Sequence, residues 1–118
     1  MKTYRRRRPS QRIQPAELFA LQLKASNIHF EREFKFHKTR RWRADFYIPT
    51  RRQPILVEIE GGVYSGGRHT RGRGYENDCE KYSEACILGY MLLRGTTNLI
   101  KSGYLIDAVN RALGDVNS

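Results

Sequence analysis

The sequence lacks any apolar run that could cross a membrane, and it is poor in cysteine. A membrane-spanning helix needs about 20 consecutive apolar residues, and the basic N-terminal stretch is not followed by the apolar segment of a secretory signal. The two cysteines, Cys79 and Cys86, would lie about 10 Å apart along one helix. A disulfide needs Cα atoms within about 7 Å of each other. We therefore expect a cytoplasmic protein with free thiols.

Two ligand-binding motifs are also missing. No closely spaced Cys-x-x-Cys pair is present, so a structural zinc on Cys79, Cys86 and His69 is disfavoured. Gly61 and Gly62 follow an apolar segment, but no Gly-Lys-Ser or Gly-Lys-Thr occurs in the chain. The glycines therefore do not form a nucleotide-binding loop.

Acidic residues are scarce relative to basic ones, with 12 Asp+Glu against 22 Lys+Arg and a formal net charge of +10. Such an excess favours a polyanionic partner, above all a nucleic acid, and arginine suits bidentate contacts with phosphate. The run Arg5, Arg6, Arg7 and Arg8 lies in a stretch with few apolar residues, so we expect a flexible, phosphate-binding arm at residues 1–12. The remaining length suits one domain, which we place at 13–114, followed by a tail at 115–118.

The spacing of apolar residues predicts alternating helices and strands. We expect a helix at 15–26, strands at 30–37, 42–48 and 55–60, a glycine-rich basic loop at 61–74, a helix at 75–88, a strand at 90–94, and a last helix capped by Ser102 with Gly114 past its end. A strand–helix–strand return implies at least one parallel pair of strands. The order α-β-β-β-α-β-α therefore predicts an α/β fold with a mixed four-stranded sheet flanked by helices.

Some of these elements carry more detailed expectations. The period-two pattern of the first strand places three phenylalanines on one face, Phe30, Phe34 and Phe36. In the helix at 75–88 we expect the buried face to consist of Tyr75, Cys79, Tyr82 and Cys86. We expect His29 and His37 on the strand surface, and Trp42 in the core rather than stacked on an unpaired base.

Acidic residues interrupt the most apolar stretches of this basic chain. Glu58 and Glu60 are two positions apart on a strand, so their side chains leave the same face. Asp45 lies on the neighbouring strand, and opposite residues of paired strands lie about 5 Å apart. Three carboxylates that meet in this way would be costly to bury, unless a divalent cation or a cross-strand arginine such as Arg43 compensates them. Oxygen ligands select Mg²⁺ or Mn²⁺, and such an ion can promote hydrolysis of a phosphodiester held by the basic loop.

The residues around these acids resemble the motifs of the PD-(D/E)xK nuclease superfamily. Residues 43–47 (RADFY) are similar to its first motif and residues 57–62 (VEIEGG) to its second. The order of elements from 15 to 113 is similar to the restriction-endonuclease-like core. A histidine in the loop after the third strand, at 67–70 (GRHT), and an apolar strand that ends in arginine, at 89–94 (GYMLLR), are similar to the very-short-patch-repair endonuclease-like branch.

The resemblance implies a metal site. Asp45, Glu58 and the backbone carbonyl of Ile59 correspond to the metal-binding groups of the superfamily. Glu17 corresponds to an acid on the first helix that completes the metal site in several members. The resemblance therefore implies Mg²⁺, or Mn²⁺, as the cofactor.

The sequence departs from the superfamily where the second motif usually ends in lysine, because Glu60 occupies that position. Three groups are candidates to position or activate water: Lys81 reaching back from its helix, His69 with its suitable titration range, and Glu60 itself. Lys81 could instead pair with Asp78 or Asn77 on its own helix. The sequence leaves these alternatives open.

The pattern as a whole predicts a metal-dependent DNA endonuclease. Loop arginines would clamp the phosphate backbone together with the N-terminal arm, namely Arg68, Arg71 and Arg73. No separate sequence-reading module is evident, so we expect structure-directed nicking or cutting of branched, mismatched or single-stranded DNA, with a homodimer as one way to make two cuts. The alternatives are a non-catalytic module that binds DNA or RNA, and an RNA endonuclease.

Overall fold

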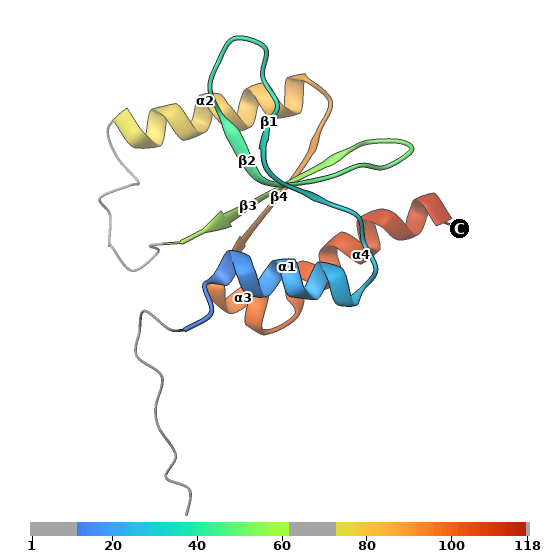
Figure 1. Ribbon diagram of the computed structural model, residues 1–118. Helices are drawn as coiled ribbons and strands as arrows, with labels where there is room; N and C mark the ends of the chain where they lie inside the picture. Colours follow the sequence, from blue (N-terminus) through green and yellow to red (C-terminus); the bar gives the residue numbers. More distant parts are fainter. Residues whose placement is uncertain (1–11, 62–72, 118) are drawn as a thin grey trace, which may run out of the picture.

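The computed structural model describes residues 12–61 and 73–117 (Figure 1). Arg5 to Arg8 in the expected N-terminal arm, and Arg68, His69 and Arg71 in the expected loop, lie outside the described residues. The elements are α1 (Pro15–Ala25), β1 (Glu31–Lys35), β2 (Arg43–Ile48), β3 (Ile55–Glu60), α2 (Arg73–Ile87), β4 (Met91–Thr96), α3 (Thr97–Lys101) and α4 (Tyr104–Asn117). Within the described ranges, no helix combines the length and apolar character that crossing a bilayer requires.

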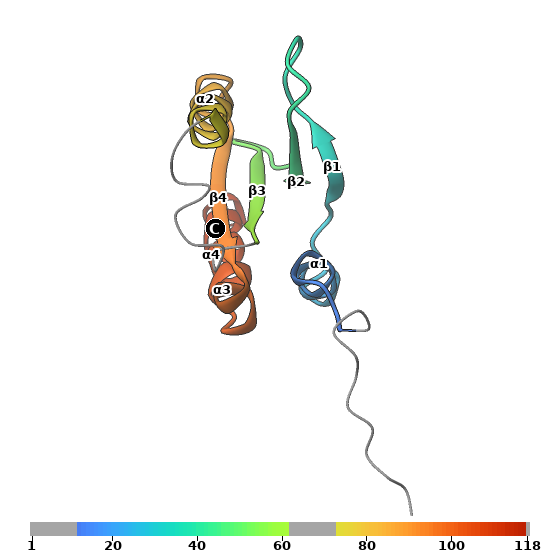
Figure 2. The same ribbon diagram turned by 90° about the vertical axis from the view of Figure 1, so that its left-hand side faces the viewer.

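The four strands form one mixed sheet in the order β1-β2-β3-β4. The pairs β1–β2 and β2–β3 are antiparallel, and β3–β4 is parallel. In the turned view of Figure 2, the strands follow one another from β4 to β1. The predicted α/β fold with a mixed four-stranded sheet is therefore confirmed, and the parallel pair is the one that the strand–helix–strand return requires.

Helices cover the two faces of the sheet unequally. Figure 1 shows α2 on one side and α1, α3 and α4 on the other. The side of α1 holds the larger core, in which Phe19 and Leu23 of α1 meet Phe46 and Val57 of the sheet. The side of α2 holds a small cluster around Leu56 and three further buried residues, Phe36, Ala44 and Ala85. The α2 side thus leaves part of the sheet uncovered by apolar side chains.

The alternation predicted for the first strand is wrong in one respect. Phe30 packs against the core on the α1 side, whereas Phe34 and Phe36 belong to the cluster on the α2 side. Between them, Glu33 has a φ of 52°, a left-handed conformation that is uncommon outside glycine. Because this residue interrupts the extended backbone, the side chains before and after it point to opposite faces of the sheet.

The buried face predicted for α2 is wrong for three of its four residues, whereas Tyr82 is partly buried against Glu60. Cys79 and Cys86 are exposed, Tyr75 is 49% exposed, and the buried residue of the helix is Ala85. The free thiols predicted for the two cysteines are confirmed. The prediction failed because it assumed that the helix packs on an apolar surface, whereas α2 turns polar side chains toward acidic residues of the sheet.

The C-terminal part contains a short helix, α3, that the sequence pattern did not indicate. The Thr96 hydroxyl caps it by accepting a hydrogen bond from the Leu99 amide at 3.2 Å. Ser102 ends this helix, and its hydroxyl also accepts a hydrogen bond from the Tyr104 amide at 3.3 Å, close to the predicted capping role. Gly114 lies within α4, which runs through Asn117, so the expectation that Gly114 lies past the end of the last helix is wrong.

Candidate active site

Asp45 on β2 and Glu58 on β3 lie next to each other at the end of the β2–β3 pairing. Phe46 is paired with Val57, so continuing the register by one residue sets Asp45 opposite Glu58. Each carboxylate accepts a hydrogen bond from the backbone of the other strand. The Asp45 amide donates to Glu58 Oε2 at 3.0 Å, and the Ile59 amide donates to Asp45 Oδ2 at 2.7 Å.

These two reciprocal bonds fix the carboxylates in place. The donors are backbone amides of β2 and β3. Hydrogen bonds to an ionised acceptor are stronger than hydrogen bonds between neutral groups. Glu58 is only 7% exposed, and Asp45 is half-buried. The local sequence explains this burial, because Glu58 lies between the apolar residues Val57 and Ile59 of β3.

Lys81 of α2 supplies the positive charge nearest to this pair. Its Nζ lies 2.5 Å from Glu58 Oε1, and both side chains are largely buried. Lys81 therefore reaches the sheet instead of pairing with Asp78 or Asn77 on its own helix, which was the alternative left open by the sequence. Of the two candidates for positioning water that lie in the described part of the chain, Lys81 and Glu60, Lys81 is the one that directly contacts Glu58.

Burial raises the pKa of both carboxyl groups. For Asp45 the hydrogen bond from the Ile59 amide works against this rise, and the nearby charge of Glu33 adds to it. For Glu58 the hydrogen bond from Lys81 and its charge work against the rise. Desolvation disfavours the charged form of an acid, so further positive charge placed at this site would stabilise both carboxylates.

Glu60 has partners of its own. Its Oε1 accepts hydrogen bonds from the Tyr82 hydroxyl at 3.1 Å and from Arg94 Nε at 2.6 Å. The Arg94 guanidinium also lies 4.3 Å from the centre of the Tyr82 ring. Burial and the charge of Glu60 raise the pKa of the Tyr82 hydroxyl, which therefore stays protonated and able to donate. Glu60 is thus neutralised by a cation beside the Asp45–Glu58 pair.

Sequence reasoning missed this arrangement around Glu60. Arg94 was noted only as the end of an apolar strand, and Tyr82 only as part of an apolar helix face. A signal was available, because in a parallel β3–β4 pair Arg94 aligns with Glu58 and shares its face of the sheet. Predicting the contact would have required the register of that pairing.

The three carboxylates that the sequence suggested do not form one cluster. Asp45 and Glu58 form a pair, and Glu60 beside them is neutralised by Arg94. Among residues 12–61 and 73–117, no three His, Cys, Asp or Glu side chains are grouped closely enough to hold a metal ion. Magnesium, however, typically takes only one or two carboxylates together with water and substrate phosphate. Asp45, Glu58 and the Ile59 carbonyl, which accepts a hydrogen bond from the Gly61 amide at 3.2 Å, are hard oxygen donors of the required kind.

Glu17 does not join this site. Its carboxylate forms an ion pair with Arg32 of β1 at 3.0 Å, and its side chain is 57% exposed. Arg32 lowers the pKa of Glu17 through a hydrogen bond and its charge. Nothing in the described part of the chain links Glu17 to Asp45 or Glu58, so its correspondence to a metal-binding acid stays a sequence prediction. Arg73 begins α2.

The structure is thus an α/β domain in which two acids of the sheet lie beside a lysine of the covering helix. No family model and no curated protein matches the sequence. Among solved structures, the chain is similar to the catalytic domain of the homing endonuclease I-Bth0305I, with a TM-score of 0.59 and 18% sequence identity over 89% of this chain and 94% of that one. At this identity the similarity shows a common fold, which is that of an endonuclease catalytic domain.

Proposed function

We propose that the protein is a metal-dependent endonuclease that hydrolyses phosphodiester bonds in DNA. The observation that carries the proposal is that two acids on adjacent strands, the half-buried Asp45 and the buried Glu58, lie together, and that Glu58 contacts a lysine from the covering helix. Asp45, Glu58 and Lys81 come from three separate elements and meet in one place. A purely structural role does not account for two acids placed together in the apolar strands of a strongly basic protein.

Asp45, Glu58 and the Ile59 carbonyl would hold Mg²⁺ or Mn²⁺. When bound, the cation supplies positive charge that polarises the phosphate and its attacking water. The buried position of Glu58 and the reciprocal backbone bonds keep these oxygen atoms oriented without the substrate. Preorganised groups of this kind lose little free energy to reorganisation during the reaction.

Lys81 is the group that we propose to position the attacking water. Its ammonium group has three donors, so it can contact Glu58 and still donate to a water molecule or a phosphate oxygen. Glu60, held by Tyr82 and Arg94, has a less direct role, and His69 remains a candidate for the same role as Lys81. We propose on this basis that the protein is a member of the PD-(D/E)xK superfamily, within the very-short-patch-repair endonuclease-like branch.

The substrate follows from charge and from the similar fold. The net charge of +10 favours a phosphate backbone, and the structure with the similar fold is named as a homing endonuclease. We propose that Arg5 to Arg8, Arg68, Arg71 and Arg73 add backbone contacts, and that the preferred substrate is branched, mismatched or single-stranded DNA.

A nicking assay tests the proposal. Supercoiled plasmid is incubated with the protein in Mg²⁺, in Mn²⁺ and in EDTA, and the Asp45→Ala variant is measured beside the wild type. We expect nicking only with a divalent cation. The variant should lose more than about 100-fold in rate, because even partners one step removed from a metal typically cost 10- to 100-fold, while its DNA binding is retained.

The result that overturns the proposal is a wild-type protein that binds DNA but never cuts it with any divalent cation. The non-catalytic binding module would then be the better description. A panel that includes single-stranded, branched and duplex DNA beside matched RNA separates a deoxyribonuclease from a ribonuclease.

A further inference from the structure

The hairpin formed by β1 and β2 exposes four basic side chains that the site described above does not use. We call these residues the basic hairpin: Lys35, Lys38, Arg41 and Arg43. Within the described ranges, every ion pair involves other basic residues, so none of the four has an acidic partner there. The positive charge of this hairpin is thus available to a ligand.

Two of these cations lie directly across from each other. Lys35 and Arg43 are paired in the β1–β2 register, and opposite residues of an antiparallel pair are about 5 Å apart. Like charges in this arrangement destabilise the sheet. A polyanion that contacts both side chains would remove this repulsion and gain affinity from it.

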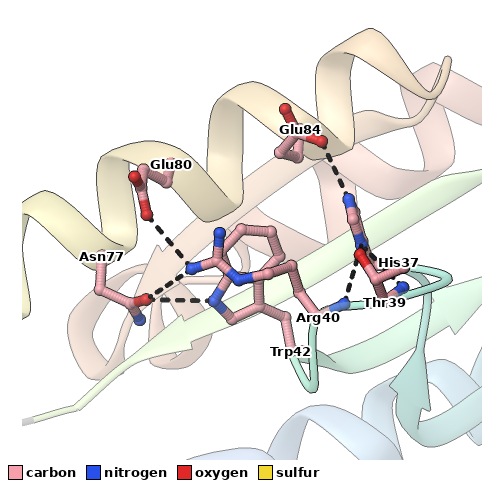
Figure 3. Close-up of polar contacts among 7 residues, drawn as sticks. All are labelled: His37, Thr39, Arg40, Trp42, Asn77, Glu80 and Glu84. Atoms are coloured by element: carbon pink, nitrogen blue, oxygen red, sulfur yellow. Dashed lines mark hydrogen bonds and ion pairs between the residues drawn. The ribbon is translucent and has the colours of Figure 1, made fainter.

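The segment between β1 and β2 is held against α2 by side-chain contacts. Figure 3 shows the contacts that hold it. His37 Nε2 lies 2.9 Å from Glu84, and His37 Nδ1 accepts a hydrogen bond from the Arg40 amide at 3.0 Å. His37 is therefore a partly buried connecting residue, and the expectation that it lies on the strand surface is wrong.

Arg40 and Trp42 complete the docking. Arg40 pairs with Glu80 at 3.2 Å, and both Arg40 and Trp42 donate to the Asn77 side-chain oxygen. The Arg40 guanidinium also lies 3.9 Å from the centre of the Trp42 ring. Trp42 packs against the cluster on the α2 side, as expected for a core residue. Arg40 is therefore used structurally, unlike the four cations of the basic hairpin.

This docking links the basic hairpin to the candidate active site. The helix that binds the hairpin through Asn77, Glu80 and Glu84 is the same helix that places Lys81 on Glu58. Figure 3 shows these three side chains along the face of α2 turned to the hairpin. The basic hairpin and the Asp45–Glu58 pair are therefore connected through one helix.

We propose that the basic hairpin is a second contact surface for the phosphate backbone of duplex DNA, away from the bond that is cut. This inference rests on the proposed nuclease function and adds to it the surface that orients the duplex. Four cations within nine residues suit a polymer that carries one negative charge per about 1.7 Å of its axis. No large apolar side chain is exposed between residues 35 and 43, whereas the centre of a protein–protein interface is usually apolar.

Salt-dependent binding tests this inference. The variant K35Q/K38Q/R41Q/R43Q is compared with the wild type by fluorescence anisotropy of a labelled duplex, in EDTA, over a range of salt concentrations. Each lost phosphate contact lowers the slope of log affinity against log salt by about 0.9, so the magnitude of the slope should fall by about 3 to 4. Because EDTA prevents metal-dependent cutting, the result is independent of whether the protein cleaves DNA.

A matched control removes the same charge elsewhere. The variant K24Q/R51Q/R52Q/K101Q changes four exposed basic residues that also have no acidic partner among the described residues. We expect it to bind with a slope close to that of the wild type, and we expect neither variant to unfold at a lower temperature than the wild type. Equal slopes for the two variants would overturn the inference, because the loss would then reflect net charge alone.

Competition with duplex RNA separates the two kinds of duplex. If RNA competes better than DNA for the wild type, and this preference disappears in the hairpin variant, the DNA assignment is wrong. If plasmid nicking fails while the slope changes as expected, the hairpin stands as a DNA-binding surface and the nuclease proposal fails. If nicking succeeds and the slope is unchanged, the nuclease proposal stands and the hairpin is not a DNA-binding surface.

Discussion

The two faces of the sheet differ in chemistry although the same strands supply both. In β3, Ile55, Val57 and Ile59 belong to the core covered by α1, α3 and α4. Their neighbours Leu56, Glu58 and Glu60 face α2, and only Leu56 is part of an apolar cluster there. Consecutive residues of one strand therefore serve either the stability of the fold or the candidate site.

This difference shows how a small domain can place charges inside its structure. Burying a carboxylate without compensation is costly, and marginal stability leaves little free energy for it. The larger core on the α1 side can supply that free energy, while α2 carries Lys81 and Tyr82 to the acids. Substitutions on the two faces of the sheet test this division of roles.

The substitution Phe46→Ala should have the largest effect on stability. Phe46 is completely buried and contacts the ring of Phe19 edge-on at 5.2 Å. Truncating a buried phenylalanine typically costs about 3 to 5 kcal/mol, which urea denaturation would measure. The matched control is Leu21→Ala on the exposed side of α1, where Leu21 is 49% exposed and the loss should stay below about 1 kcal/mol. Equal losses for the two variants would contradict the location of the core.

The substitution Lys81→Met should lower the free energy of unfolding by about 2 to 3 kcal/mol. It leaves Glu58 without its counter-charge, and breaking a fully buried pair costs about 3 to 5 kcal/mol. The double variant Lys81→Met/Glu58→Gln should recover much of this stability, because no uncompensated charge remains. Neither variant should nick DNA. A double variant that is no more stable than the single one would show that the pair has no electrostatic role in the fold.

The substitution Gly95→Ala tests the tightness of the core on the α1 side. A Cβ at this position would lie 2.5 Å from a methyl carbon of Leu105, which is itself buried. Overpacking of this kind costs about 1 to 3 kcal/mol. Gly114→Ala is the control, since nothing lies within 4 Å of its added methyl group and alanine should stabilise the helix by up to about 1 kcal/mol. Thermal unfolding should shift in opposite directions for the two variants.

The substitution Tyr82→Phe should have the smallest effect. It removes the hydrogen bond from the Tyr82 hydroxyl to Glu60, while the ion pair between Glu60 and Arg94 remains. A single hydrogen bond contributes about 1 kcal/mol to stability, and we expect a change of that size in urea denaturation with nicking retained. Tyr75→Phe, on a ring that is 49% exposed, should change nothing. Complete loss of nicking in Tyr82→Phe would mean that Glu60 takes part directly in the reaction.

The sequence pattern was sufficient for most of the sheet. The third strand was predicted with the bounds that the structure shows, Ile55–Glu60, because its apolar residues lie between turn residues. The convergence of Asp45 and Glu58 could also be predicted, since a hairpin fixes which residues face each other. The departures occur where local geometry or a tertiary contact overrides the pattern, as at Glu33 with its left-handed backbone and on α2, whose covered face is polar.

Other features could not be predicted because they join distant parts of the chain. The contacts of α2 with the β1–β2 hairpin link residues more than 30 positions apart, such as Trp42 with Asn77 and His37 with Glu84. No periodicity encodes such a pairing. The helix had therefore been interpreted from its cysteines and tyrosines, which are spaced like an apolar face, whereas Cys79, Cys86 and Tyr75 are exposed.

The sequence by itself determined the mixed sheet and the placement of two acids on neighbouring strands, because strand periodicity and hairpin pairing are local properties. Only the tertiary structure decided which cation meets each acid. Lys81 contacts Glu58 and Arg94 contacts Glu60, and both contacts depend on how α2 and β4 pack against β3. The physical reason is that long side chains can reach several partners, and burial between packed elements selects one of them.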